Sequence, residues 1–165
     1  MAAASPVVLH SGLRWFLISA LVVVLDQLTK FWISQSLAPG EVVPLAPFFN
    51  LVLTYNTGAA FSLLSQASGW QRGFFIGVAA VASLLIAYLI HRYHQRRLFS
   101  LGLSLILGGA VGNLWDRVAL GQVVDFLDFY IQATHWPAFN VADSAITCGA
   151  ALLIWDSFGR SQARH

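Results

Sequence analysis

The stretch "LFSLGLSLILGGAVGNLWDR", residues 98–117, contains no charged side chain until Asp116 and Arg117 at its end. An α-helix needs about 20 predominantly apolar residues to cross the hydrocarbon core of a bilayer. Residues 98–115 approach that length. We therefore predict a transmembrane helix that ends beside a carboxylate and a guanidinium group.

The composition of the whole chain extends this prediction. Of its 165 residues, 58% are hydrophobic and only 10% are charged, and the mean hydropathy is +0.70. A soluble domain carries about 25% charged residues, because its surface faces water. We expect an all-α membrane protein with four transmembrane helices, forming one membrane-embedded domain over residues 1–165. The four predicted spans are 14–34, 73–90, 98–115 and 139–158.

The charge pattern predicts the orientation in the membrane. The segment "HRYHQRR" (91–97) and the C-terminal tail, with Arg160 and Arg164, are basic, whereas 35–71 contains Glu41 and no Lys or Arg. By the positive-inside rule, the 91–97 loop and both termini are cytoplasmic. The first span is expected to be retained, because its apolar core continues into "DQLTKFW" and not into a cleavage site. Segments 35–71 and 116–138 then lie outside.

Part of the first outer segment is expected to be β structure. In "FFNLVLTYN" (48–56), Leu51, Leu53 and Tyr55 alternate with Val52, Thr54 and Asn56, which is the period of a half-buried strand. We predict a small extracytoplasmic β element at about 41–66, followed by a short helix or loop up to Trp70.

Charged residues inside predicted spans need partners, because a lone charge in hydrocarbon costs roughly 2.5–3.5 kcal/mol. Asp26 and Lys30 are four residues apart on one helical face, which suits an ion pair. Near the end of the third span, Asn113, Asp116 and Arg117 share a helical face and are interpreted first as scaffold. Gly108 and Gly112, just before them, have the spacing that lets helices approach closely.

Asp143 differs, because the nearest basic residue that follows it is Arg160. A buried acid without a local partner is protonated or paired across helices, which makes Asp143 a candidate for function. Asp156, about 20 Å further along the same helix, is expected to be solvated at the cytoplasmic interface. If Asp143 meets a second carboxylate from the 116–138 loop, one acid can hold a proton while the other activates water.

Other functions fit the sequence less well. The chain has a net charge of +2 but no basic stripe with interleaved aromatics, which argues against nucleic-acid binding. A single cysteine, Cys148, excludes an internal disulfide and is interpreted as a small core residue. Neither H-E-x-x-H nor G-x-S-x-G occurs. A Ser34–Lys30 dyad is disfavoured, because Asp26 would hold the proton of Lys30. The remaining alternative is a small proton-coupled transporter or assembly subunit with Asp26 and Asp143 as relay groups, although no internal repeat is visible.

Five motifs in order give the chain a specific resemblance. They are "DQLTK" (26–30), "YNTGAAFSLL" (55–64), "GGAVGNLWDRV" (108–118), "VVDF" (123–126) and "FNVADSAI" (139–146). Together they resemble the lipoprotein signal peptidase (signal peptidase II) family of bacterial membrane aspartyl peptidases, over nearly the whole chain.

The resemblance implies four transmembrane helices, a β-cradle on the outer leaflet and a short extracytoplasmic helix over the site. It implies an aspartic endopeptidase of the bacterial cytoplasmic (inner) membrane, which removes signal peptides from diacylglyceryl-modified prolipoproteins just before the lipidated cysteine. The implied partners are this substrate, membrane lipids and globomycin-class inhibitors, with no cofactor and no metal. The implied catalytic pair is Asp125 and Asp143, whereas Asp128 lies outside the motifs and is expected to be solvated. Residues that would shape the site or bind substrate are Asp26, Lys30, Asn56, Gly58, Asn113, Asp116, Arg117, Asn140 and Ala142.

Overall fold

The computed structural model describes residues 12–57 and 70–162. They contain four helices and four short strands. In order, the elements are α1 (Leu13–Ser36), β1 (Val42–Ala46), β2 (Phe49–Asn56), α2 (Trp70–Tyr93), α3 (Arg97–Ala119), β3 (Val123–Ile131), β4 (Thr134–His135) and α4 (Val141–Gln162). Residues 58–66 of the predicted β element and the short helix or loop predicted before Trp70 lie outside the described residues, as does Gly58.

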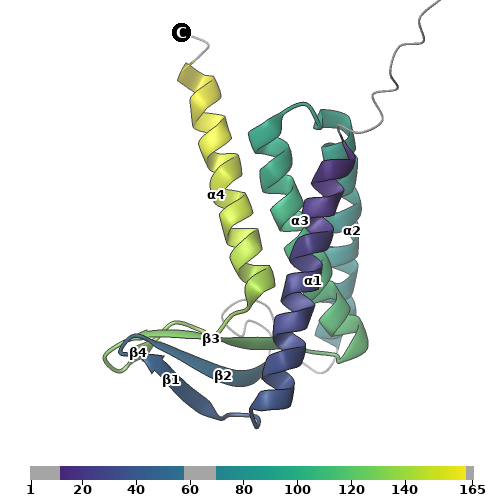
Figure 1. The fold of residues 1–165 in the computed structure, drawn as a ribbon. Helices are drawn as coiled ribbons and strands as arrows, with labels where there is room; N and C mark the ends of the chain where they lie inside the picture. Colours follow the sequence, from purple (N-terminus) through teal and green to yellow (C-terminus); the bar gives the residue numbers. More distant parts are fainter. Residues whose placement is uncertain (1–11, 58–69, 163–165) are drawn as a thin grey trace, which may run out of the picture.

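All four helices are long and apolar enough to cross a membrane, which confirms the four predicted spans. Helix α3 packs against α1, α2 and α4, so it is the centre of the bundle (Figure 1). A hydrophobic cluster of Trp15, Ile90, Leu103 and Leu107 joins α1, α2 and α3. The start of α1 and the end of α4 lie at the end of the bundle opposite the sheet (Figure 1).

Glycines on α3 allow the neighbouring helices to approach closely. A Cβ on Gly108 would lie 2.6 Å from Val22 Cβ of α1, and a Cβ on Gly109 would collide with the carbonyl oxygen of Ala142 in α4. These separations leave no room for a methyl group. The small residues therefore fix the distances from α3 to both α1 and α4.

Replacing Gly109 with alanine should therefore push α4 away from α3. We expect a loss of about 1–3 kcal/mol in stability, as for other overpacked interiors, and lower activity because Ala142 adjoins Asp143. The matched control is Gly77→Ala on α2, where a Cβ would meet no heavy atom within 4 Å. Thermal unfolding of both variants in lipid or detergent checks this. Equal melting temperatures for the two variants would contradict it.

The four strands form one antiparallel sheet in the order β1-β2-β3-β4. The sheet lies across the end of the bundle where α1 ends and α4 begins (Figure 1). Leu53, Val124 and Phe126 of the sheet pack with Ile33 of α1 in a second hydrophobic cluster. Strands β1 and β2 fall inside the predicted β element. Strand β3, which carries Asp125, lies within 116–138, where a loop and no strand was predicted.

Two acids of α4 depart from the sequence prediction. The span was predicted to begin at residue 139, but α4 begins only at Val141, so Asp143 is in the first turn of the helix. Asp156 is not simply solvated: its carboxylate accepts a hydrogen bond from Arg96 Nη2 at 2.7 Å, and only 14% of its side chain is exposed. This ion pair joins the α2–α3 connection to α4 at the end opposite the sheet.

Candidate active site

Lys30 is at the centre of a buried ionic network where α1 and α3 reach the sheet. Its Nζ lies 2.8 Å from Asp26 Oδ2, 2.8 Å from Asp116 Oδ2 and 2.9 Å from Asn113 Oδ1. These contacts use the three N–H donors of an ammonium group. The predicted Asp26–Lys30 pair is confirmed, and Asp116 joins it as a second carboxylate.

The two carboxylates of this network also hold backbone groups of the elements that carry the candidate site. Asp26 Oδ1 accepts a hydrogen bond from the backbone N–H of Ala142, at the start of α4. Asp116 Oδ2 accepts one from the backbone N–H of Val124 in β3. Gln27, which the sequence analysis did not single out, donates its amide to both Asp26 and Asp116. The network therefore ties α1 and α3 to β3 and α4.

Asn113 connects the network to Asp143. Its Oδ1 accepts from Lys30, and its Nδ2 donates to Asp143 Oδ1 at 2.8 Å. Because the amide oxygen points at a cation, the amide nitrogen must point at the carboxylate. Lys30 thus sets the orientation of Asn113, and Asn113 holds Asp143 in turn.

Asn140 joins the two predicted catalytic acids. It caps α4, with Oδ1 accepting from the backbone N–H of Asp143 at 2.9 Å, while Asp143 Oδ2 accepts from the Asn140 N–H at 3.3 Å. This reciprocal pattern is a capping box with an aspartate in the position of the usual glutamate. The Nδ2 of the same Asn140 donates to Asp125 Oδ1 at 2.7 Å. One fully buried side chain therefore contacts both acids.

Asp125 is buried in β3, where its side chain is 3% exposed. Burial, together with the negative charge of Asp143, raises the pKa of Asp125 to about 7. Hydrogen bonds from Asn56 and Asn140, and the charge of Lys30, act in the opposite direction. Asp125 can therefore hold a proton at neutral pH, which an ordinary aspartate cannot.

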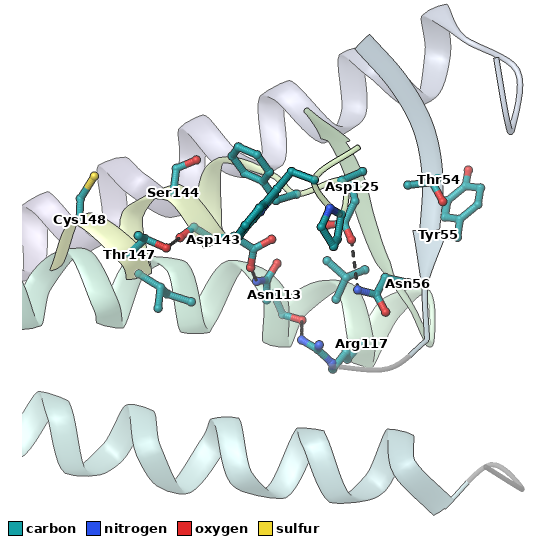
Figure 2. Close-up of a pocket in the computed structure, with 16 residues that line it drawn as sticks. Thr54, Tyr55, Asn56, Asn113, Arg117, Asp125, Asp143, Ser144, Thr147 and Cys148 are labelled. Atoms are coloured by element: carbon teal, nitrogen blue, oxygen red, sulfur yellow. Dashed lines mark hydrogen bonds between the residues drawn. The ribbon is translucent and has the colours of Figure 1, made fainter. Parts of the chain in front are cut away.

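Both acids line a cavity of about 740 Å³, which is within the range of small-molecule and peptide sites. Figure 2 shows Asn56 beside Asp125 and Asn113 beside Asp143, with Arg117 below them. Strand β2, the 136–139 segment and one face of α4 complete the wall. Cys148 is also on this wall and is exposed, so its interpretation as a core residue was wrong.

Arg117 lines the same cavity. Its Nη1 donates to the carbonyl oxygen of Asn113 at 3.2 Å, and its guanidinium lies 5.4 Å from the ring centroid of Phe75. Arg72, which the sequence analysis did not consider for the site, donates to the carbonyl oxygens of Arg117 and Val118 and so anchors the end of α3. The scaffold interpretation of this helix end is consistent with these contacts.

The structure brings nearly all of the predicted site residues together. Ala142 is fully buried next to Asp26 and Asp143. Gly58 lies outside the described residues and stays a prediction. Asp128 is only 6% exposed, so its expected solvation was wrong, and its partners are Asn50 and His135. Within the described ranges, no group of three or more His, Cys, Asp or Glu side chains is placed to hold a metal ion.

The chain is similar to known proteins over most of its length. The signal peptidase (SPase) II family model matches residues 18–159. A lipoprotein signal peptidase of Cupriavidus necator is 57% identical over 153 residues, which cover 93% of this chain and 87% of that protein. One from Burkholderia pseudomallei is 55% identical over 146 residues, 88% of each chain.

Two solved structures, each described as a bacterial membrane enzyme, share the fold. The first has a TM-score of 0.83 at 31% identity and covers 92% of both chains. The second has a TM-score of 0.75 at 33% identity, covering 87% of this chain and 91% of the other. The similarity therefore extends over the helices and the sheet alike.

Proposed function

The chain belongs to the signal peptidase II family, and from this premise we propose that Asp125 and Asp143 are the catalytic pair with which it cleaves prolipoproteins. The observation that carries the proposal is the position of Asn140. Its amide contacts Asp125 and its capping box contains Asp143, so two acids from separate elements face one cavity. Such a pair can hydrolyse a peptide bond by acid–base catalysis.

In the mechanism that we propose, Asp125 begins the reaction protonated and Asp143 begins it as a carboxylate. Asp143 removes a proton from water as the water oxygen attacks the scissile carbonyl carbon, and Asp125 donates a hydrogen bond to the carbonyl oxygen. The proton on Asp143 then passes to the leaving nitrogen as the C–N bond breaks. The raised pKa of Asp125 supports a proton on this acid at the start of the reaction.

The remaining site residues are proposed to position this pair or the substrate. Lys30 pairs with Asp26 and Asp116, and these two carboxylates hold the backbone of Ala142 and Val124. Asn140 and Ala142 position the start of α4. Asn56 contacts Asp125 directly, and Arg117 provides a cation in the cavity wall. Gly58 belongs to the same proposal on the strength of the motif alone.

We place the cavity near the outer leaflet of the bacterial inner membrane, with both termini in the cytoplasm. The basic residues Arg92, Arg96 and Arg97 lie at the end of α2, in the α2–α3 connection and at the start of α3. This is the end of the bundle opposite the sheet, and the positive-inside rule assigns such a basic end to the cytoplasmic side. The wall of the cavity continues along α4 through Thr147 and Cys148. A diacylglyceryl-cysteine could therefore keep its acyl chains among the membrane lipids while its peptide reaches the acids. Globomycin-class inhibitors would occupy the same cavity.

The substrate proposal is tested with one prolipoprotein in two forms. The purified protein in lipid nanodiscs should cleave the diacylglyceryl-modified precursor, and it should cleave the unlipidated precursor at least about a hundredfold more slowly. The reason is that acyl chains confine the peptide to the bilayer surface and raise its effective concentration. Equal rates for the two forms would rule out lipid recognition.

The pKa of Asp125 predicts how activity depends on pH. Asp125 is protonated below about 7 and ionised above it, so kcat/KM should fall as the pH rises through 7 and the acid is lost. Asn56→Ala removes a hydrogen bond that lowers this pKa. The alkaline limb of that variant should therefore move to higher pH, by about 0.5 to 1 pH unit. Profiles measured from pH 5 to 9 check both statements, and an unshifted limb in the variant would contradict the assignment.

A further inference from the structure

A second buried acid, Asp128, lies in β3 three residues after Asp125 and outside the catalytic pair. Its neighbour across the sheet is Asn50, whose Nδ2 donates to Asp128 Oδ2 at 2.8 Å. His135 Nδ1 lies 2.8 and 3.0 Å from the two carboxylate oxygens. Since an ionised carboxylate can only accept, Nδ1 is the donor. A buried acid costs free energy unless hydrogen bonds satisfy it. Asp128 therefore favours the arrangement of β2 and β4 in which their side chains reach its carboxylate.

His135 is the residue directly before a wall of the cavity. Trp136, Pro137, Ala138 and Phe139 line that wall, which then leads into the Asn140 cap of α4. The far end of the wall is fixed at Phe139, whose N–H and carbonyl oxygen bond to the backbone of Leu127. Two hydrogen bonds fix the near end of the wall: one joins the His135 side chain to Asp128, and in the other the backbone N–H of Trp136 donates to the carbonyl oxygen of Phe129.

We propose that Asp128 and His135 are positioning residues, whose hydrogen bond sets the place of the 136–139 wall and thereby the affinity of the cavity for its peptide substrate. The inference rests on the proposed function, since that function identifies the cavity as the peptide site. Neither residue touches Asp125 or Asp143 in the contacts described above. The hydrogen bond therefore acts on substrate binding and leaves the chemical step unchanged.

Two features of His135 could hold the wall, and they can be separated. The imidazole donates to Asp128, and it also stacks on the ring of Tyr130 with centroids 5.0 Å apart. His135→Asn keeps a donor close to the place of Nδ1 but loses the stacked ring. His135→Phe keeps a stacked ring but loses the donor. His135→Ala loses both features, and Thr134→Ala is the matched control on the same strand.

The experiment measures kcat and KM for cleavage of a diacylglyceryl-modified prolipoprotein by the full chain in nanodiscs. We expect His135→Ala and His135→Phe to raise KM about three- to tenfold, with kcat within about twofold of the wild type. His135→Asn and Thr134→Ala should keep a KM within about twofold of the wild type. The side chain of His135 is 52% exposed, and if His135→Ala fails to fold, the Phe and Asn variants decide the matter.

An unchanged KM in His135→Phe would overturn the inference, as would a KM in His135→Asn that is as high as in His135→Phe. A fall in kcat without a rise in KM would overturn it too. Failure of the wild-type protein to cleave the precursor would instead refute the proposed function. The two failures are therefore distinguishable in a single set of assays.

Discussion

Asp125→Asn and Asp143→Asn are each expected to slow prolipoprotein cleavage by at least about a hundredfold, because a positioned acid or base contributes about 10²–10⁴ to rate. Asparagine keeps the size of the side chain. At position 143 it can neither take a proton from water nor give one to the leaving amine, and at position 125 its amide is a far weaker acid than a carboxyl group and polarises the carbonyl oxygen less. Both variants should remain folded, since the ionic network around Lys30 does not depend on either charge. Single-turnover cleavage, with thermal unfolding measured on the same samples, checks the prediction.

The matched control is Asp156→Asn, the same change on the same helix as Asp143. Asp156 lies about 20 Å from Asp143 along the helix axis and pairs with Arg96 at the other end of α4, so cleavage should continue at close to the wild-type rate. If either catalytic variant cleaved as fast as Asp156→Asn, the proposed pair would be wrong. A transporter with relay acids, which the comparisons do not support, would show no cleavage in any of these proteins.

Lys30→Met should destabilise the protein strongly. Lys30 is the only lysine in the sequence, it is 3% exposed, and its ammonium lies between the carboxylates of Asp26 and Asp116. Removal of the cation leaves two buried acids without compensation, which costs about 3–5 kcal/mol for a buried pair. Asn113 Oδ1 would lose the hydrogen bond from Lys30 and keep only the one from Asn140, so cleavage should fall together with stability.

Arg96→Met provides the matched comparison, since it also replaces a paired cation with an apolar chain. Arg96 and its partner Asp156 are 31% and 14% exposed, and ion pairs of this partly solvated kind contribute less than about 1 kcal/mol. Melting temperatures in the same detergent should therefore fall much further for Lys30→Met. Similar losses in the two variants would show that the Lys30 network does not hold the site together.

The transmembrane helices were predictable because each depends only on the hydropathy of its own consecutive residues. The sheet was only partly predictable. Alternation revealed β2, but "VVDFLDFYI" in β3 is apolar at nearly every position, and its partner strand lies some seventy residues earlier in the chain. Pairing over such a distance leaves no local period, so β3 was taken for a loop. The burial of Asp128 was missed for the same reason, since Asn50 and His135 come from other strands.

The candidate site shows the same division. The Asp26–Lys30 pair follows from helical spacing, and the structure confirms it. The meeting of Asp125 with Asp143 does not follow from spacing, because it depends on Asn140 and on a strand that the sequence analysis did not find. The motif resemblance supplied that pairing. Gln27, adjacent to Asp26, could have been found by asking which donors satisfy two acids that share one lysine.

The mass of the cleavage products shows which peptide bond the protein cuts. Purified wild-type protein in nanodiscs is incubated with a diacylglyceryl-modified prolipoprotein, and the products are identified by mass spectrometry. We predict a single cut, which releases the signal peptide and leaves the lipidated cysteine as the new N-terminal residue. An intact precursor in the presence of folded protein, or a cut at any other peptide bond, would contradict the account.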